Sequence, residues 1–437
     1  MTQATLTPGF TKDAFDAFLS ARNEPDWLID RRRSAWKVFC EQELPSRSDE
    51  EWMRTDIRLF KLDSFGIPGE LQGEIEIPTP LLTAGVDLAG QGASLNGQTV
   101  DYSIGQQWID QGVLFGDLAR LTVEHSELLR PYLMKGAFDF AADKFSALHG
   151  ACWSSGTLLY VPRGVVVDGP FHALSALADG GVDLGHLLVI LEEGSEATLL
   201  TETANTGSVA GGFHCGATEI IVGPNAHLRY VSLQNWDQRV WHFSHENVVV
   251  KGDASLQWTM GALGSRLAKV NQHVELTGEG AQVQVNGTMF TEGRQHLSYH
   301  TRQHHVAPNC RSDFLYKAAL QDKSRTIWRG MIKVDLAAQK TNGYQRNDNL
   351  LLSSQARADA IPGLEIDADD VRCTHGSTTS RVDDEMIFYA ESRGFTRNEA
   401  IRMIVTGFFQ QIFDRISIES VRESLGMAIA RRVREYE

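Results

Sequence analysis

The chain has 437 residues, too many for one ordinary small domain and suited to two or three domains or one elongated repeat domain. Hydrophobic residues make up 42% of it, which is enough for a sizeable core. Its 56 acidic and 41 basic residues give a net charge of -15, and this charge argues against general binding of nucleic acid because it repels phosphate backbones. No apolar run is long enough to span a bilayer, and residues 1–10 lack the features of a secretory signal.

The cysteines are few, scattered and without a C-x-x-C pair. An odd, sparse set in a long chain without a signal is typical of reduced thiols, so we expect a cytoplasmic protein that does not bind membranes. The set consists of Cys40, Cys152, Cys215, Cys310 and Cys373.

Residues 1–155 are predicted to form an N-terminal, mainly helical region. Phe15, Phe18 and Leu19 have the three-and-four spacing of a helix. A second, roughly periodic apolar pattern extends from about Gly112 to His149 and predicts further helix.

A repeat begins near Gly156, where short β-branched and leucine-rich runs alternate with Gly, Asn and Asp turns. The unit of strand, tight turn and strand recurs about every 28 residues. A single unit cannot bury both of its faces, whereas stacked coils pair each strand with the coils above and below it. We therefore predict a right-handed parallel β-helix (β-solenoid) over residues 156–390; the alternative is a β-sandwich of ordinary hairpins. Four copies of the turn are residues 193–195, 223–225, 251–253 and 278–280.

Residues 391–437 are predicted to form a C-terminal helical region, so the fold class is mainly β with helical ends. Thr396 and Glu399 have the spacing of a capping box, which starts a helix. An apolar stripe at helical spacing follows it. The stripe contains Ile401, Ile404, Val405, Phe408, Ile412 and Ile416, and Phe409 and Phe413 widen it.

Cys373 and His375 are the first candidates for metal chemistry. They are two positions apart, so on an extended strand both side chains point to the same face. Thiolate and imidazole suit iron or zinc, but a closed structural site normally needs four ligands. The pair would therefore be completed across an interface, or it is a buried cysteine beside a hydrogen-bonded histidine at the edge of the core.

A second candidate is a run of histidines. His296, His300 and His304 share strand parity, and His305 follows them. Such a face either binds a metal ion or is a polar ladder on the solvated surface of the solenoid.

A third candidate is an acidic cluster made of Glu365, Asp367, Asp369 and Asp370. Alternate members share a strand face, and aligned carboxylates on extracellular β-helix enzymes bind calcium or cleave glycosidic bonds. A carbohydrate-active β-helix enzyme is therefore the alternative function. The sequence contains no G-x-x-x-x-G-K-[ST] loop for hydrolysis of ATP.

A long and specific pattern extends from Asn347 to Arg393, around Cys373-Thr374-His375-Gly376. Shorter matching segments are residues 23–27, 144–148, 305–309 and 315–317. Over these segments the chain resembles the SufB/SufD family of iron–sulfur cluster assembly proteins. Ala356 occupies the position at which SufB has a cysteine, so the resemblance is closer to SufD, although Ser377 and His149 depart from the family pattern.

The resemblance implies a scaffold and not an enzyme: a SufD-like subunit of the SUF (SufBCD) complex. In that complex a SufB/SufD heterodimer of β-helix proteins holds the ABC-type ATPase SufC through C-terminal helices. A transient iron–sulfur cluster is built near the junction of the two β-helices, and no cofactor is held permanently. An isolated chain would also be able to form a homodimer through an exposed sheet edge.

The resemblance also assigns roles to residues. His375 maps onto the SufD histidine that serves as a ligand for the nascent cluster or iron, and Cys373 is a second candidate ligand. Phe408, Ile412 and Phe413 become candidate anchors for the ATPase. The alternative for these three is packing of the stripe against the solenoid itself.

Overall fold

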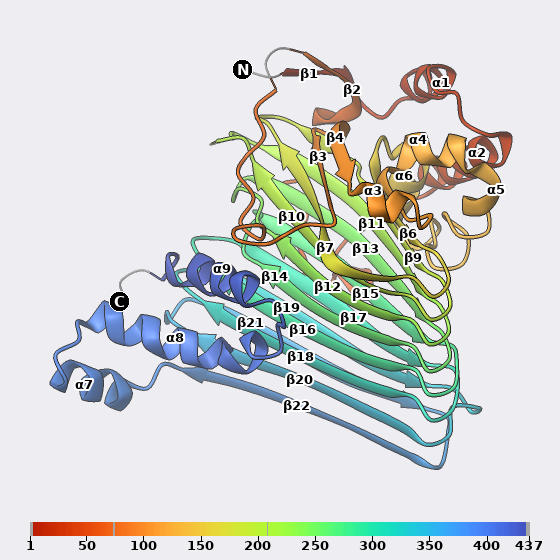
Figure 1. The fold of residues 1–437 in the computed structure, drawn as a ribbon. Helices are drawn as coiled ribbons and strands as arrows, with labels where there is room; N and C mark the ends of the chain where they lie inside the picture. The colour runs from red at the N-terminus through yellow and green to blue at the C-terminus, as the bar shows by residue number, and fades with distance from the viewer. Residues whose placement is uncertain (1–2, 73–74, 208, 434–437) are drawn as a thin grey trace.

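The computed structural model describes residues 3–72, 75–207 and 209–433. Two large sheets face each other along most of its length (Figure 1). Sheet I has the order β4 (Gln98–Ile104), β3 (Gly90–Leu95), β7 (Val166–Leu177), β10 (Glu196–Asn205), β12 (His227–Gln234), β14 (Ser255–Ala262), β16 (Gln282–Thr291), β18 (Arg311–Leu320), β20 (Thr341–Leu351) and β22 (Val371–Arg381). Sheet II has the order β5 (Leu114–Asp117), β6 (Gly156–Val161), β9 (His186–Leu191), β11 (Gly212–Val222), β13 (Val240–Val250), β15 (Leu267–Leu276), β17 (His296–His305), β19 (Arg325–Val334) and β21 (Arg357–Ile366), with β8 (Val182–Asp183) beside β11.

The chain passes from one sheet to the other as it winds, so each coil contributes a strand to both. From β6 to β22 every strand pairs in parallel with the strand of the next coil, and the register offset ranges from 26 residues (Trp241 with Leu267) to 32 residues (Arg325 with Arg357). This pairing confirms the predicted β-solenoid and excludes a sandwich of hairpins, because hairpins pair consecutive strands antiparallel. In the described residues, antiparallel pairs occur in the N-terminal region and where it meets the first coil: β3 with β4, β5 with β6, and β1 (Gln3–Pro8) with β2 (Gly66–Gln72).

The tight turn from sheet II to sheet I has the same backbone in successive coils. Gly194, Asn225, Asp253 and Gly280 each have φ between 53° and 76° there. Gly adopts this left-handed region without a steric cost, and Asn and Asp tolerate it better than other residues. The N–H group of each left-handed residue donates to a carbonyl of the next turn, as from Asn225 to Gly252 at 2.9 Å, so the turns stack as the strands do.

Apolar ladders fill the space between the sheets. One ladder on sheet II joins Leu191, Val222, Val250 and Leu276, which lie at equivalent register positions of four coils. All four side chains are almost fully buried. Burial of each such side chain stabilises the fold by about 1.5–3 kcal/mol relative to exposure.

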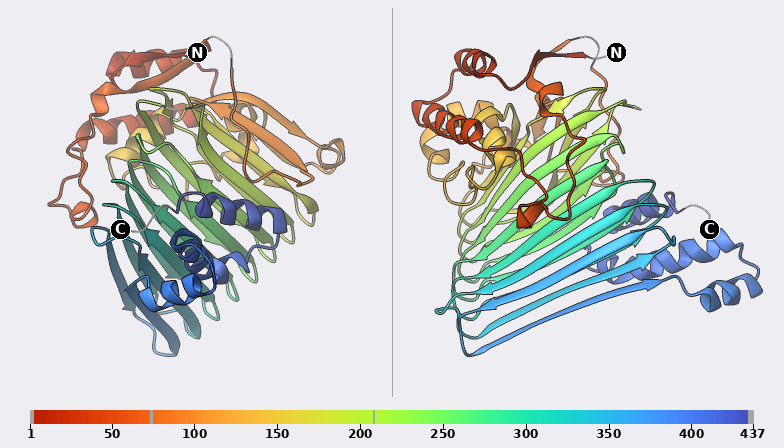
Figure 2. Two further views of the ribbon diagram at one scale, coloured as in Figure 1. Left: turned by 90° about the vertical axis from the view of Figure 1, so that its left-hand side faces the viewer. Right: turned by 180° about the vertical axis from the view of Figure 1, so that it is seen from behind.

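The N-terminal region covers the first coils, at one end of the solenoid (Figure 2). Its α-helices are α1 (Lys12–Ser20), α2 (Asp26–Glu41), α3 (Gln106–Ile109), α4 (Leu118–Glu124), α5 (Ser126–Leu129) and α6 (Lys144–Cys152), and two short 3-10 helices are Glu50–Trp52 and Leu62–Ser64. Residues 112–149 therefore hold a strand and separate helices, because Asp117 and Asp143 each cap a new helix. Strands β3, β4 and β5 extend the two sheets, so this region also contributes to the solenoid walls.

A buried arginine fastens α2 to α6. The Arg32 guanidinium is fully buried, and it donates to both Glu24 carboxylate oxygens, at 2.6 and 2.8 Å. It also donates to the carbonyls of Ala151 and Trp153 and lies over the Trp153 ring, 4.3 Å from its centroid. Burial lowers the pKa of Arg32 to about 10, which still leaves the side chain charged at neutral pH.

Three helices follow the last coil: α7 (Asp384–Ser392), α8 (Arg397–Phe413) and α9 (Glu419–Ala430). Helices α8 and α9 lie against the outer face of sheet I, with α8 in contact with β16 and β18, whereas α7 packs on α8 beyond the edge of the sheet (Figure 1). The predicted capping box of Thr396 and Glu399 is present. No helix in the described part of the chain combines the length and apolar character needed to cross a membrane.

The stacked turns give a first prediction. Replacing Asn225 with Val places a β-branched residue at φ 55°, so we expect the free energy of unfolding to fall by about 1–2 kcal/mol in urea denaturation. The matched control Asn225→Gly removes the same side chain without the strain and should change stability by less than about 0.5 kcal/mol. Equal stabilities for the two variants would contradict this account of the turn.

Candidate functional site

The solenoid ends at β21 and β22, whose outer edges pair with no further strand among the described residues. We call the two strands of this last coil the open end. Leu364 and Ile366 of β21 are in register with Ile332 and Val334, which are fully buried one coil earlier. Yet Leu364 and Ile366 are exposed, because no following coil covers them.

His375 lies at the open end, in a position that is buried elsewhere in the solenoid. It is in register with Gln345, which is fully buried and whose side-chain amide donates to the Gly363 carbonyl of the facing sheet at 3.0 Å. Alternate residues of a strand share a face, so His375 has the inward-facing parity of Gln345. The imidazole is exposed because the solenoid stops there.

Cys373 shares the strand face of His375, as the spacing predicted. It is half-buried against Ile332, Val334 and Ala338, and burial raises the pKa of its thiol. In the described residues, no third His, Cys, Asp or Glu side chain joins this pair in a group that could hold a common ion. The two side chains are thus too few, by themselves, for a closed metal site.

The prediction that the acidic cluster shares one strand face is wrong. Glu365 is in β21, but Asp367, Asp369 and Asp370 lie in the turn before β22, where the strand alternation no longer holds. The Glu365 carboxylate pairs with Lys333 Nζ at 3.0 Å. These residues therefore form a charged turn without a shared carboxylate face.

The predicted parity of His296, His300 and His304 is present in β17, but the three do not converge. Four residues of a strand span about 13 Å, too far for neighbouring members to bind one ion. His300 Nδ1 is 2.6 Å from the Glu51 carboxylate of the N-terminal region, whereas His304 Nε2 is 3.0 Å from Asp335 of the next coil. A single metal site on all three is excluded.

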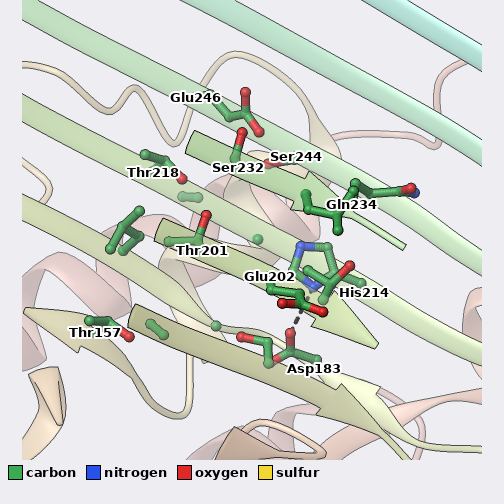
Figure 3. Close-up of a pocket in the computed structure, with 18 of the residues that line it drawn as sticks. Thr157, Asp183, Thr201, Glu202, His214, Thr218, Ser232, Gln234, Ser244 and Glu246 are labelled. Atoms are coloured by element: carbon green, nitrogen blue, oxygen red, sulfur yellow. Dashed lines mark hydrogen bonds and ion pairs between the residues drawn. The ribbon is translucent and has the colours of Figure 1, made fainter. Parts of the chain in front are cut away.

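A polar cavity of about 120 Å³ lies between the two sheets in the early coils (Figure 3). Asp183 accepts from His214 Nδ1 at 2.8 Å, and the His214 ring stacks on His242 with centroids 4.6 Å apart. Further polar groups that line it are Thr157, Thr201, Glu202, Thr218, Ser232, Gln234, Ser244 and Glu246. The cavity is large enough for several water-sized molecules and offers them hydrogen-bond partners.

A buried network that the sequence did not reveal joins α6 to sheet II. His149 Nε2 is 2.9 Å from His186 Nδ1, and His186 Nε2 is 3.1 Å from the Glu219 carboxylate. That carboxylate accepts the N–H groups of Met134 at 2.6 Å and Phe138 at 3.2 Å. Burial lowers the pKa of His149 well below its usual range, so this histidine is neutral and structural.

The C-terminal stripe is largely internal. Ile412 and Phe413 are both buried, and Phe413 belongs to a cluster with residues of sheet I, so neither side chain is exposed for a partner to contact. Phe408 is half-buried, and its carbonyl accepts from Lys317 Nζ at 2.9 Å. The burial of Ile412 and Phe413 favours the alternative that this part of the stripe packs internally.

Large exposed apolar side chains occur in α7, in the link that follows it and in the first half of α8. We call these side chains the α7 surface. Phe388 is 72% exposed and Tyr389 is 61% exposed. The full set is Met386, Phe388, Tyr389, Phe395 and Met403.

Two family models match the chain along most of its length. The SUF system FeS cluster assembly, SufBD core domain matches residues 174–408, and the SufBD protein N-terminal region matches residues 17–172. The chain belongs to the SufBD family of iron–sulfur cluster assembly proteins.

Individual relatives agree with the family models. Iron–sulfur cluster assembly SufBD family proteins of Staphylococcus aureus and Staphylococcus epidermidis are each 26% identical over 434 residues. The aligned part covers 94% of this chain and 90% of each relative. The resemblance predicted from the sequence is confirmed at the level of the SufBD family, and the carbohydrate-active alternative is not favoured.

The cavity of this SufBD protein gives a pH prediction. Burial raises the pKa of Glu246 from its ordinary value of 4.5 to about 7, although Gln272 donates to its carboxylate at 2.7 Å. A carboxyl whose pKa is raised by folding makes the fold less stable as the pH rises from the unfolded to the folded pKa. As the pH rises from 5 to 8, the titration of Glu246 should therefore lower the free energy of unfolding of the wild type by about 2–3 kcal/mol.

The variant Glu246→Gln lacks that titration and keeps an oxygen that can accept from Gln272. Urea denaturation at both pH values should therefore show Glu246→Gln gaining stability over the wild type as the pH rises. Parallel pH profiles for the two proteins would show that Glu246 titrates normally.

Proposed function

We propose that this SufBD protein is a SufD-like scaffold subunit that supports assembly of iron–sulfur clusters with a SufB partner and the SufC ATPase. The observation that carries the proposal is the position of His375, an inward-facing residue exposed on the last coil of the solenoid. The chain itself performs no catalysis in this proposal. Its five cysteines are all free, in keeping with a cytoplasmic protein.

The open end supports the pairing with SufB. Strands β21 and β22 present unpaired edges, and such edges favour addition of further strands. A second β-helix placed there would cover the apolar side chains of Leu364 and Ile366 and enclose His375. Heterodimer formation would thereby complete the coil that the chain leaves open.

His375 would then act as a ligand for the nascent cluster or iron, which are cargo and not resident cofactors. An imidazole offers one lone pair, so the partner must supply further ligands. Cys373 is a weaker candidate, because burial holds its thiol in the protonated form. Such an incomplete ligand set suits a site from which a finished cluster is released.

The α7 surface supports docking of the ATPase. Helix α7 projects away from the two sheets (Figure 2). Helix α8 is held on sheet I by the hydrogen bond from Lys317 to the Phe408 carbonyl and by Arg415, just after the helix, which donates to the Asn286 side chain at 2.7 Å. Movement of a docked ATPase would therefore be transmitted through α8 to sheet I. We propose that this movement opens and closes the junction at the open end by a hinge-type motion.

The first test is His375→Ala. The variant should lose at least about tenfold in cluster assembly in cells, because one ligand is removed, while complex formation and thermal stability stay unchanged. His227→Ala is the matched control: His227 is also exposed on sheet I but lies on β12, far from the open end. Normal cluster assembly in cells that carry His375→Ala would show that His375 is not a required ligand.

The second test asks whether the α7 surface is the docking site of the ATPase. Phe388→Glu should weaken ATPase binding about 10–100-fold in calorimetry, because burial of a Phe side chain is worth about 1.5–3 kcal/mol. Met427→Glu changes an exposed apolar residue of α9 and should have little effect. A larger loss for Met427→Glu than for Phe388→Glu would move the docking site away from α7.

A further inference from the structure

Three potential metal ligands meet on the outer face of sheet II, two coils before the open end. His273 and Glu275 come from β15, and His304 comes from β17. The register places Glu275 directly beside His304, so two adjacent coils contribute to one group. One ligand atom from each residue lies within 4.8 Å of the others, and no other trio of His, Cys, Asp or Glu meets this condition in the described residues.

Both imidazoles direct a nitrogen to the same carboxylate oxygen. His304 Nδ1 is 3.4 Å from Glu275 Oε1, and His273 Nε2 is 3.5 Å from the same atom. Both nitrogens are buried, and neither makes a hydrogen bond of acceptable geometry. Two unsatisfied nitrogens facing one carboxylate oxygen are the kind of arrangement that a bound cation would satisfy.

Asp335 holds the His304 ring in the orientation needed for such a ligand. Its carboxylate is 3.0 Å from His304 Nε2 and accepts the proton on that nitrogen. In the neutral form that a metal ion would bind, with Nε2 as the donor, Nδ1 would offer its lone pair on the side of Glu275. A carboxylate behind a ligating histidine is the usual outer-shell partner in metal sites.

The distances fit a tetrahedral ion. Bonds of 2.0–2.1 Å to nitrogen and oxygen place neighbouring donor atoms about 3.4 Å apart, close to the two nitrogen–oxygen distances already present. The remaining adjustment is a closer approach of the two histidine nitrogens.

We propose that His273, Glu275 and His304 bind a divalent transition-metal ion, with Zn²⁺ as the best fit and solvent in the fourth position. Two imidazoles and one carboxylate are the ligand set of open zinc sites. The ion would join β15 to β17 from outside and so fasten two coils together. This site is independent of the proposed cluster chemistry at the open end.

The test is a titration of the metal-free full chain with Co²⁺ and Zn²⁺. It uses the His375→Ala chain as background, so that ions at the open end are not counted. We expect visible Co²⁺ absorption bands typical of tetrahedral nitrogen and oxygen ligands, and displacement of cobalt by one equivalent of Zn²⁺. Bound Zn²⁺ should also raise the thermal midpoint, because the ion binds only the folded chain.

Variants in the same background decide which residues are responsible. His304→Ala and Glu275→Gln should each weaken Zn²⁺ binding by at least about tenfold, and Asp335→Asn by about 10–100-fold through loss of ring positioning. His227→Ala should leave the affinity unchanged. Absence of stoichiometric binding, or equal affinity in Glu275→Gln, would show that the cluster is only an ion-pair ladder around His304.

Discussion

Hydrogen bonding from coil to coil is the constraint on which this structure depends. The strands between β6 and the last coil obtain partners from neighbouring coils, and the left-handed turns obtain theirs in the same way. The N-terminal region covers the start of this series, where β4 and β5 end the sheets. At the other end the series stops at β21 and β22, so the exposure of His375 follows directly from the architecture.

The N-terminal and C-terminal helices contact the solenoid in different ways. The N-terminal region is bound to the solenoid through the network of His149, His186 and Glu219, and Arg32 joins α2 to α6 within that region. The C-terminal helices bury one face on sheet I and leave the α7 surface exposed. In the proposed function the first group stabilises the scaffold, while the second connects a partner to strands β16 and β18 of sheet I.

The sequence predicted the solenoid well because each coil repeats one backbone requirement, visible at Gly194, Asn225 and Asp253. It also predicted the shared face of Cys373 and His375, which needs only strand alternation. It could not place Glu275 beside His304, since their register depends on the length of the intervening coil. Nor could it separate internal packing from docking at Ile412, because both require an apolar helix face.

The central claim is that the open end pairs with a second β-helix protein in a complex that includes the ATPase. The most direct measurement is to co-express the tagged chain with SufB and SufC from one host, purify the complex and determine its molar mass by light scattering. We expect a stable assembly whose mass requires all three proteins. Elution of this chain alone, or only as a homodimer, with both partners well expressed would contradict the claim.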